Sequence, residues 1–214
     1  MDAPELSPVQ LRVVGCLLEK ELATPDTYPL TMNGLLAACN QSSNRQPVVH
    51  YEEPTVSNAI ENLKATGVVR VVHSRSNRAD RFRQVIDELL DLDVPARAVL
   101  AVLMLRGPQT TAEVRARTER LHPFASDGAA EQVLHDLAAD DRSLAVQLAR
   151  QPGQKEPRWA HLLGGPLSDD DLAAAASSGP AASVGHRSDR LQALEDAVVQ
   201  LQADLAQLRR DLGA

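Results

Sequence analysis

Apolar residues recur every three or four positions along much of the chain, the spacing that places side chains on one face of a helix. In the first 66 residues this spacing predicts three helices, over residues 7–22, 31–40 and 54–66. Ser7 is a typical N-terminal cap for the first helix, and Gly67 is a typical stop after the third. The next two runs, VVRVVHS and DRFRQVI, flank a polar turn and predict a β-hairpin.

The same order of elements returns in the second half of the sequence. Residues 97–106 predict a helix, Thr110 and Glu113 form a capping box that opens another, and residues 127–139 predict a third before the strand-like runs LAVQLAR and WAHLL. The segments TVSNAIENLKATGVVRVV and AAEQVLHDLAADDRSLAVQL occupy equivalent places about 75 residues apart, which indicates an internal duplication. Three helices followed by a hairpin is the order of a winged helix.

We therefore expect a fold that is mainly α with small β-hairpins (α+β): two tandem winged-helix domains plus a C-terminal coiled-coil helix. The expected bounds are 1–88 and 89–165 for the two domains, 166–188 for a linker rich in Ala, Ser, Gly and Asp, and 189–214 for the coiled coil. Its seam alternates spacings of three and four, through Leu191, Leu194, Val198, Leu201, Leu205, Leu208 and Leu212. Such a seam can pair with itself in a homodimer, with another protein, or with the globular part of this chain.

Several longer strings carry a resemblance to a known family. These are GCLLEKELATPDTYPLT from residue 15, AACNQ followed by SNR within 37–45, LRGPQT from residue 105, and then RARTERLH and QPGQKEPRWAHLL. Together they resemble the YceH family of bacterial proteins as far as about residue 165. The resemblance implies two tandem winged-helix domains and a dimer, with no established biochemical activity. The linker and the heptads depart from the family pattern, so the family's dimer interface need not be the only one here.

Composition excludes a membrane protein and offers little support for an enzyme. The longest apolar run, residues 98–105, is far shorter than the roughly 20 residues of a membrane-spanning helix, and the N-terminus lacks the pattern of a signal peptide, so we expect a cytoplasmic protein. Cys16 and Cys39 lie among apolar neighbours and are expected to be buried free thiols. The six histidines lack metal-ligand spacing, and no phosphate-binding loop or nucleophile elbow occurs. No metal, cofactor or catalytic residue is therefore predicted, and only a deep polar pocket between the domains would favour an enzyme.

The first hairpin holds the most suggestive cluster of charge. Arg70, Arg75, Arg78, Arg81 and Arg83 fall within fourteen residues and are opposed only by Asp80. Arginine forks match phosphate oxygens, and each neutralised phosphate releases counterions, so these side chains are candidates for DNA contact. The alternative is a solvated edge strand that charge protects from aggregation.

Two neighbouring segments extend this candidate site. The loop after the second helix offers Asn40, Gln41, Ser43, Asn44 and Arg45, which can donate to bases or phosphates or can fix the loop through local hydrogen bonds. The third helix would enter the groove with a polar face that includes Ser57, Asn58, Asn62 and Lys64. Its N-terminal Glu52 and Glu53 would repel phosphate, and residues 1–85 carry nine basic and nine acidic side chains, so any DNA affinity must come from local clustering.

In the second predicted domain, Arg117 lies toward a helix face that ought to be buried, which indicates either a structural ion pair or a side chain that lines a cleft. Trp159 is expected in the core or at an interface.

The sequence thus favours a non-catalytic protein that binds double-stranded DNA as a dimeric transcriptional regulator, with Asn58 and Asn62 at base edges and Arg75 and Arg78 on the backbone. The alternative is a protein–protein interaction scaffold that uses the winged helices and the coiled-coil tail without DNA.

Overall fold

The structure is a computed structural model that describes residues 3–73, 79–150 and 154–167. Its contacts divide the chain into two units, Met1–Asp169 and Asp170–Ala214, and every described residue belongs to the first. The predicted coiled-coil seam, most of the predicted linker, and Arg75 and Arg78 lie outside the described residues. Within them the fold is mixed α/β, with seven α-helices, one short 3₁₀ helix (Pro25–Thr27) and two small antiparallel sheets.

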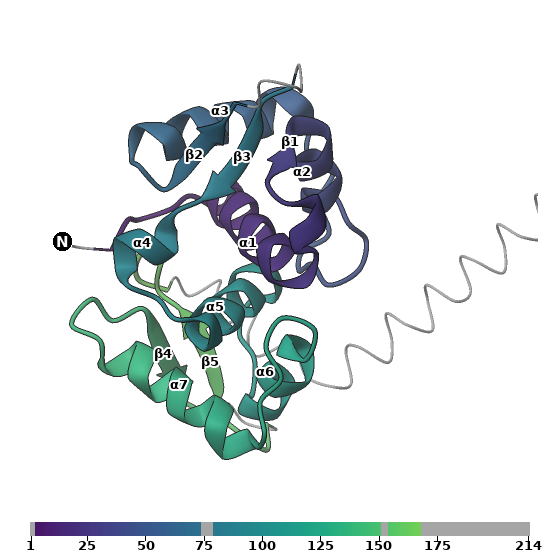
Figure 1. Ribbon diagram of the computed structural model, residues 1–214. Coiled ribbons are helices and arrows are strands. Elements are labelled where there is room, and N and C mark those ends of the chain that lie inside the picture. Colours follow the sequence, from purple (N-terminus) through teal and green to yellow (C-terminus); the bar gives the residue numbers. More distant parts are fainter. Residues whose placement is uncertain (1–2, 74–78, 151–153, 168–214) are drawn as a thin grey trace, which may run out of the picture. The chain divides into compact units, whose positions relative to one another are not determined.

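The N-terminal half, residues 3–84, follows the predicted order and adds one strand (Figure 1). Its elements are α1 (Pro8–Ala23), β1 (Leu30–Thr31), α2 (Met32–Cys39), α3 (Glu53–Ala65), β2 (Val69–Val72) and β3 (Arg81–Gln84). The three strands pair antiparallel in the order β1-β3-β2. The caps explain the helix starts: Ser7 forms a capping box with Gln10, and the Thr31 hydroxyl accepts a hydrogen bond from the Gly34 amide.

The C-terminal half, residues 94–167, follows a short connecting helix, α4 (Ile86–Leu90). Its elements are α5 (Val94–Arg106), α6 (Thr111–Thr118), α7 (Asp127–Ala139), β4 (Ala145–Leu148) and β5 (Arg158–His161). The expectation that the first of these helices begins at residue 97 was three residues late, because Asp93 caps α5 by accepting from the Ala96 amide and Pro95 suits its first turn. The predicted domain boundary at residue 88 falls inside α4.

The two halves repeat one pairing pattern as well as one order of helices. In the N-terminal half, β1 lies between two helices and pairs with β3, the last strand of its hairpin. In the C-terminal half, Gln109 lies between α5 and α6 and pairs with Trp159 of β5 through N–O distances of 2.9 and 2.7 Å. Thr31 and Thr110, the residues that end these two bridging segments, each cap the next helix. The two halves therefore share one order of elements and one bridging pair, although the first sheet has three strands and the second has two.

A continuous core joins the halves through α1 and α5, which lie side by side in Figure 1. Every residue from Ala98 to Leu105 is buried, so α5 is covered on all sides. Gly15 of α1 permits the close approach, because a Cβ atom there would lie 3.0 Å from the Leu105 side chain and 3.2 Å from Met104 Cβ. Cys16, Cys39 and Trp159 are buried, and both cysteines are free thiols, as predicted.

None of the helices formed by residues 3–73, 79–150 and 154–167 is long and apolar enough to cross a membrane.

The contact at Gly15 leads to the first testable prediction. Gly15→Val adds three carbon atoms where α1 meets α5 and should lower the free energy of unfolding by about 1–3 kcal/mol, the usual cost of overpacking a core. Gly128→Val is the matched control, because Gly128 is an exposed helical glycine whose nearest neighbour would lie 3.7 Å from the added Cβ. Urea unfolding followed by circular dichroism measures both. Equal stability of the two variants would show that the α1–α5 contact is not close-packed.

Candidate functional site

Helix α3 presents the polar face that the sequence predicts. It buries Val56, Ala59, Ile60 and Leu63, and the helix packs against α1, α2 and β2. Asn58, Asn62 and Lys64 are exposed, and Ser57 is half-buried. Lys64, the lone cation of this face, forms an ion pair with Glu61 at 3.0 Å. The exposed face is therefore rich in hydrogen-bonding groups and poor in free positive charge.

The described arginines of the hairpin are already engaged. Arg70 and Arg83 both bind the carboxylate of Glu88, at 3.0 and 2.6 Å, and Arg81 donates to the Pro29 carbonyl at 2.8 Å. The hydrogen bond from Arg83 and the charge of Arg70 hold the pKa of Glu88 below its ordinary value. Asp80 is the only acidic residue among the fourteen residues of the cluster, but Glu88, from beyond the hairpin, also opposes Arg70 and Arg83.

Two residues of the segment after α2, Asn40 and Arg45, form hydrogen bonds within the protein. Arg45 is 4% exposed; its guanidinium binds both oxygens of Glu19 at 3.0 and 2.7 Å and also donates to the Ala38 and Asn44 carbonyls. Asn40 clamps Tyr51 by donating to its carbonyl at 2.8 Å and accepting from its amide at 2.7 Å. The donors of Arg45 are used inside the protein, so this residue is not free to contact DNA. The alternative, that these side chains fix the loop through hydrogen bonds, fits both residues.

A second buried arginine was missed from the sequence. Arg12, 4% exposed, donates from α1 to the Cys39 carbonyl at 3.1 Å and to the Pro47 carbonyl at 2.6 Å. It lies among the apolar positions of α1, and the only sign of its burial in the sequence is its place beside Val13 and Val14. Arg12 and Arg45 together hold the segment from residue 39 to 47 against α1.

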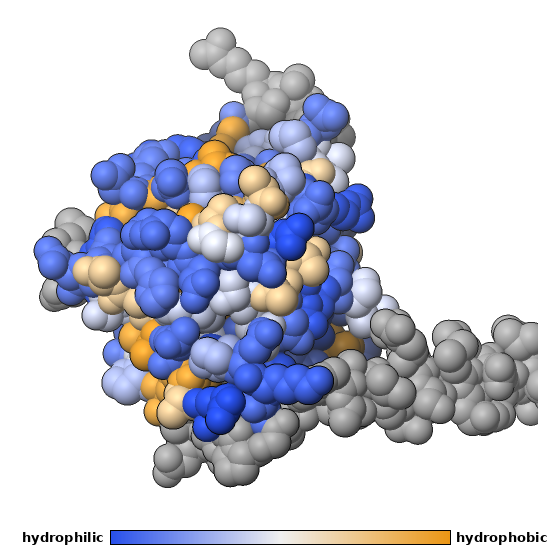
Figure 2. Space-filling view, turned by 90° about the horizontal axis from the view of Figure 1, so that it is seen from below, coloured by the Kyte–Doolittle hydropathy of each residue, from blue (hydrophilic) through white to orange (hydrophobic). Residues whose placement is uncertain are grey.

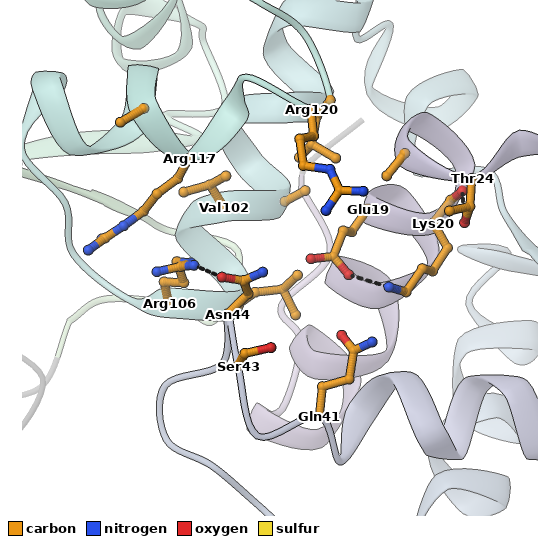
Figure 3. A pocket seen from close by; sticks show the side chains of 15 residues that line it. Glu19, Lys20, Thr24, Gln41, Ser43, Asn44, Val102, Arg106, Arg117 and Arg120 are labelled. Atoms are coloured by element: carbon orange, nitrogen blue, oxygen red, sulfur yellow. Dashed lines mark hydrogen bonds and ion pairs between the residues drawn. The ribbon is translucent and has the colours of Figure 1, made fainter. Parts of the chain in front are cut away.

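A pocket of about 390 Å³ opens where α1, the 41–44 loop, α5 and the α6 region meet. Figure 3 shows the side chains that surround it. Polar and charged groups dominate its lining, which also includes apolar atoms of α5 and α6. The lining residues are Glu19, Lys20, Ala23, Thr24, Gln41, Ser43, Asn44, Ala101, Val102, Leu105, Arg106, Ala116, Arg117, Arg120 and Leu121. Three of the residues predicted to contact DNA, Gln41, Ser43 and Asn44, thus border this pocket.

Arg117 satisfies both interpretations offered for it. It pairs with Glu113, one turn earlier on α6, at 3.5 Å, and it also lines the pocket. Arg158 binds the other oxygen of Glu113 at 3.0 Å. Burial lowers the pKa of Arg117, and the charge of Glu113 only partly offsets that effect.

Comparison with known proteins places the chain in a family. A family model described as "Protein of unknown function, DUF480" matches residues 6–154. The chain belongs to the DUF480 family. The YceH family, to which its sequence strings pointed, is the same family.

Relatives of this DUF480 chain match it over almost its whole length. A UPF0502 protein of Geobacter sulfurreducens is 47% identical over 200 residues, covering 92% of this chain and 90% of that protein. Another, of Stenotrophomonas maltophilia, is 44% identical over 212 residues, 97% of this chain and 96% of that protein. The resemblance was expected to end near residue 165. A match over 97% of the chain extends well beyond that point, so such relatives carry a counterpart of most of the C-terminal segment.

The described part of this DUF480 chain shows no metal centre. Among those residues no three His, Cys, Asp or Glu side chains come together in a way that could hold a metal ion. The pocket is lined by one carboxylate, Glu19, and by neither histidine nor cysteine. Burial raises the pKa of Glu19, but the hydrogen bonds and charge of Arg45 outweigh burial and hold that pKa below its ordinary value. An anchored, ionised carboxylate is poorly suited to proton transfer near neutral pH.

The Arg45–Glu19 pair gives a stability prediction. Glu19→Gln should lower the free energy of unfolding by about 3 kcal/mol near neutral pH, because it leaves a fully buried guanidinium without its counter-charge. Glu88→Gln removes a carboxylate from an exposed pair and should change stability little. Urea unfolding of the protein and the two variants measures this. A Glu19→Gln protein as stable as Glu88→Gln would contradict it.

The same pair sets a pH dependence. Because folding lowers the pKa of Glu19, its contribution to stability is complete above pH 4.5, the ordinary value, and is lost as the pH falls through the lowered pKa. The difference in unfolding free energy between the protein and Glu19→Gln should therefore be constant from pH 7 to about pH 5 and shrink below pH 4.5. Urea unfolding at each pH measures that difference. A difference that grows on acidification would show that the pKa of Glu19 is raised instead.

Proposed function

We propose that the chain is a non-catalytic protein that binds double-stranded DNA through tandem winged-helix domains and works as a homodimeric transcriptional regulator in the cytoplasm. The observation that carries this proposal is the arrangement of the N-terminal half. Helix α3 lies beside the β2–β3 hairpin, as Figure 1 shows, and it carries an exposed polar face. In a winged helix these two elements are the ones that face DNA.

The strand pairing supports the assignment to that fold class. A winged helix places a short strand between its first two helices and pairs it with the last strand of the wing. The sheet order β1-β3-β2 and the position of β1 between α1 and α2 match this arrangement. The Gln109–Trp159 bridge supplies the equivalent pairing in the C-terminal half, which supports a tandem pair.

The proposed contacts with DNA are of two kinds, to base edges and to the phosphate backbone. Asn58 and Asn62, exposed on α3, offer amides that suit adenine edges, and Ser57 and Lys64 flank them. Arg75 and Arg78, which lie outside the described residues, remain the proposed backbone contacts. Affinity from charge alone should be weak, because Glu61 and Glu88 pair with the described cations around them.

A DNA titration tests this proposal. Fluorescence anisotropy with duplexes selected from a random pool should give a specific complex whose affinity falls as salt rises. Asn58→Ala combined with Asn62→Ala should cost about 1–3 kcal/mol per lost base contact. The control is Gln132→Ala on α7, which removes an exposed amide from the other half. No retained duplex at low salt, or equal binding by all three proteins, would remove α3 from the mechanism.

Glu88 gives a further prediction, in which a substitution increases DNA affinity. Exposed ion pairs contribute little to stability, so DNA phosphates can replace Glu88 on Arg70 and Arg83. Glu88→Gln should therefore tighten DNA binding several-fold at low salt and steepen the salt dependence by about one unit per phosphate gained. Glu131→Gln, an exposed position on α7, makes the same change in net charge. If both variants gained equally, net charge alone would account for the effect.

The ion pairs of the hairpin favour a second candidate. Because Arg70 and Arg83 share Glu88, and Glu52 and Glu53 lie at the start of α3, this surface also suits a protein partner. The chain would then be an interaction scaffold, with the C-terminal seam forming the homodimer or holding the partner. Analytical ultracentrifugation with and without residues 187–214, combined with the DNA titration, separates the two candidates. Loss of the dimer in the shortened chain, with no DNA bound by either form, would favour the scaffold.

A further inference from the structure

The pocket between α1 and the α6 region is positively charged although the protein is acidic. Its lining holds four cationic side chains, from Lys20, Arg106, Arg117 and Arg120, against the carboxylate of Glu19. The whole chain carries a formal charge of −7. Such a concentration of positive charge in a concave, polar site is an electrostatic feature that the acidic overall composition does not explain.

The negative charge in the pocket is already compensated from behind. Arg45, whose side chain is fully buried, binds both oxygens of Glu19, and Lys20 lies 3.2 Å from one of them. Glu19 is therefore shared between Arg45 and Lys20, and the lining as a whole keeps an excess of positive charge. Glu113, which pairs with Arg117, is shared with Arg158.

Two guanidiniums keep donors available. Arg106 donates to the side-chain oxygen of Asn44 and has no carboxylate partner within the described residues. Arg120 is exposed and, in the same part of the chain, forms no ion pair. Figure 3 shows Arg120 extending toward Glu19 and Arg106 reaching Asn44, whereas Arg117 points away from that group.

Arg106 is partly buried and lies close to another cation, Arg117. Burial and the nearby charge of Arg117 lower the pKa of Arg106 to about 10, so the guanidinium is charged at neutral pH but held at an electrostatic cost. An anion bound between the arginines would relieve that cost. The geometry of the lining, and not this shift, decides what kind of anion fits.

We propose that this pocket binds a small phosphorylated molecule that carries hydroxyl groups, with its phosphate held by Arg106 and Arg120 and assisted by Lys20. A phosphate monoester has nearly two negative charges at neutral pH and several acceptor oxygens, which suits guanidinium donors that approach from separate elements. Thr24, Gln41 and Ser43 line the pocket with uncharged polar groups that match hydroxyls. The volume of about 390 Å³ lies at the small end of the range for ligand sites, so a sugar phosphate fits better than a large cofactor.

This site is independent of the proposed DNA surface. None of its lining residues belongs to α3 or to the strands of the hairpin. It draws α1 and the 41–44 loop from one half and α5 and the α6 region from the other, so a bound ligand would contact both halves at once. If the protein bound no DNA, the phosphate site would be unaffected. If it bound no phosphate, the proposed DNA surface would be unaffected.

Calorimetric titration of the full chain with ribose 5-phosphate, inorganic phosphate and ribose tests the proposal. Ribose 5-phosphate should bind and raise the thermal midpoint, inorganic phosphate should bind more weakly and compete with it, and ribose should not bind. Succinate, an anion without phosphate, should be at least tenfold weaker than ribose 5-phosphate. Equal binding of succinate, or no heat and no thermal shift with either phosphate at 10 mM, would overturn the assignment.

Two charge-matched double variants locate the site. Arg106→Gln with Arg120→Gln should weaken ribose 5-phosphate at least tenfold, because two charge-assisted donors are lost. Arg115→Gln with Arg150→Gln removes the same charge from exposed arginines that do not line the pocket, and it should leave affinity unchanged. Arg106→Lys with Arg120→Lys keeps the charge and, when circular dichroism shows it folded, should recover only part of the affinity. Equal losses in the two glutamine variants would place the phosphate elsewhere.

Discussion

The contact between α1 and α5 is the constraint on which the rest of the structure depends. Gly15 lets the two helices approach until Leu105 and Met104 lie against the α1 backbone, which buries α5 on all sides. Glu19 follows Gly15 by one helical turn, and Arg106 follows Leu105 directly, so the same contact brings these charged groups to opposite sides of the pocket. A core contact thereby fixes the geometry of a polar site, although none of the apolar residues involved could bind a ligand by itself.

Charge is used differently in the interior and on the surface of this protein. Arg12 and Arg45 are buried. Arg12 donates to backbone carbonyls and Arg45 binds Glu19, so removing a partner leaves a buried charge that water cannot solvate. Arg70 and Arg83 share Glu88 in solvent, where a phosphate can replace the carboxylate with little loss. An arginine in the sequence therefore says little about function until its partner and its burial are known.

Local signals predicted the helices well, and contacts distant in sequence account for what they missed. The cap at Ser7, the capping box at Thr110 and the stop at Gly67, whose φ of 75° suits glycine, all depend on neighbouring residues, which is why the sequence sufficed for them. Strand β1 has only two residues and exists because β3 pairs with it. The inward turn of Arg45 depends on Glu19, twenty-six positions away, and no local pattern indicates that pairing.

The pocket could not be predicted for the same reason, since its cations come from separate elements that tertiary packing brings together. The internal duplication that the sequence indicates would allow the two halves to differ in role. Both expose one face of their third helix, α3 or α7, but α7 presents Glu131 and Asp136 with His135 packed edge-on against Trp159. Those carboxylates would repel a phosphate backbone more strongly than the face of α3, where Lys64 pairs with Glu61 and lies near Asn58 and Asn62. If one ancestral winged helix was copied, DNA contact is thus more compatible with the N-terminal copy, while the C-terminal copy contributes the arginines of the pocket.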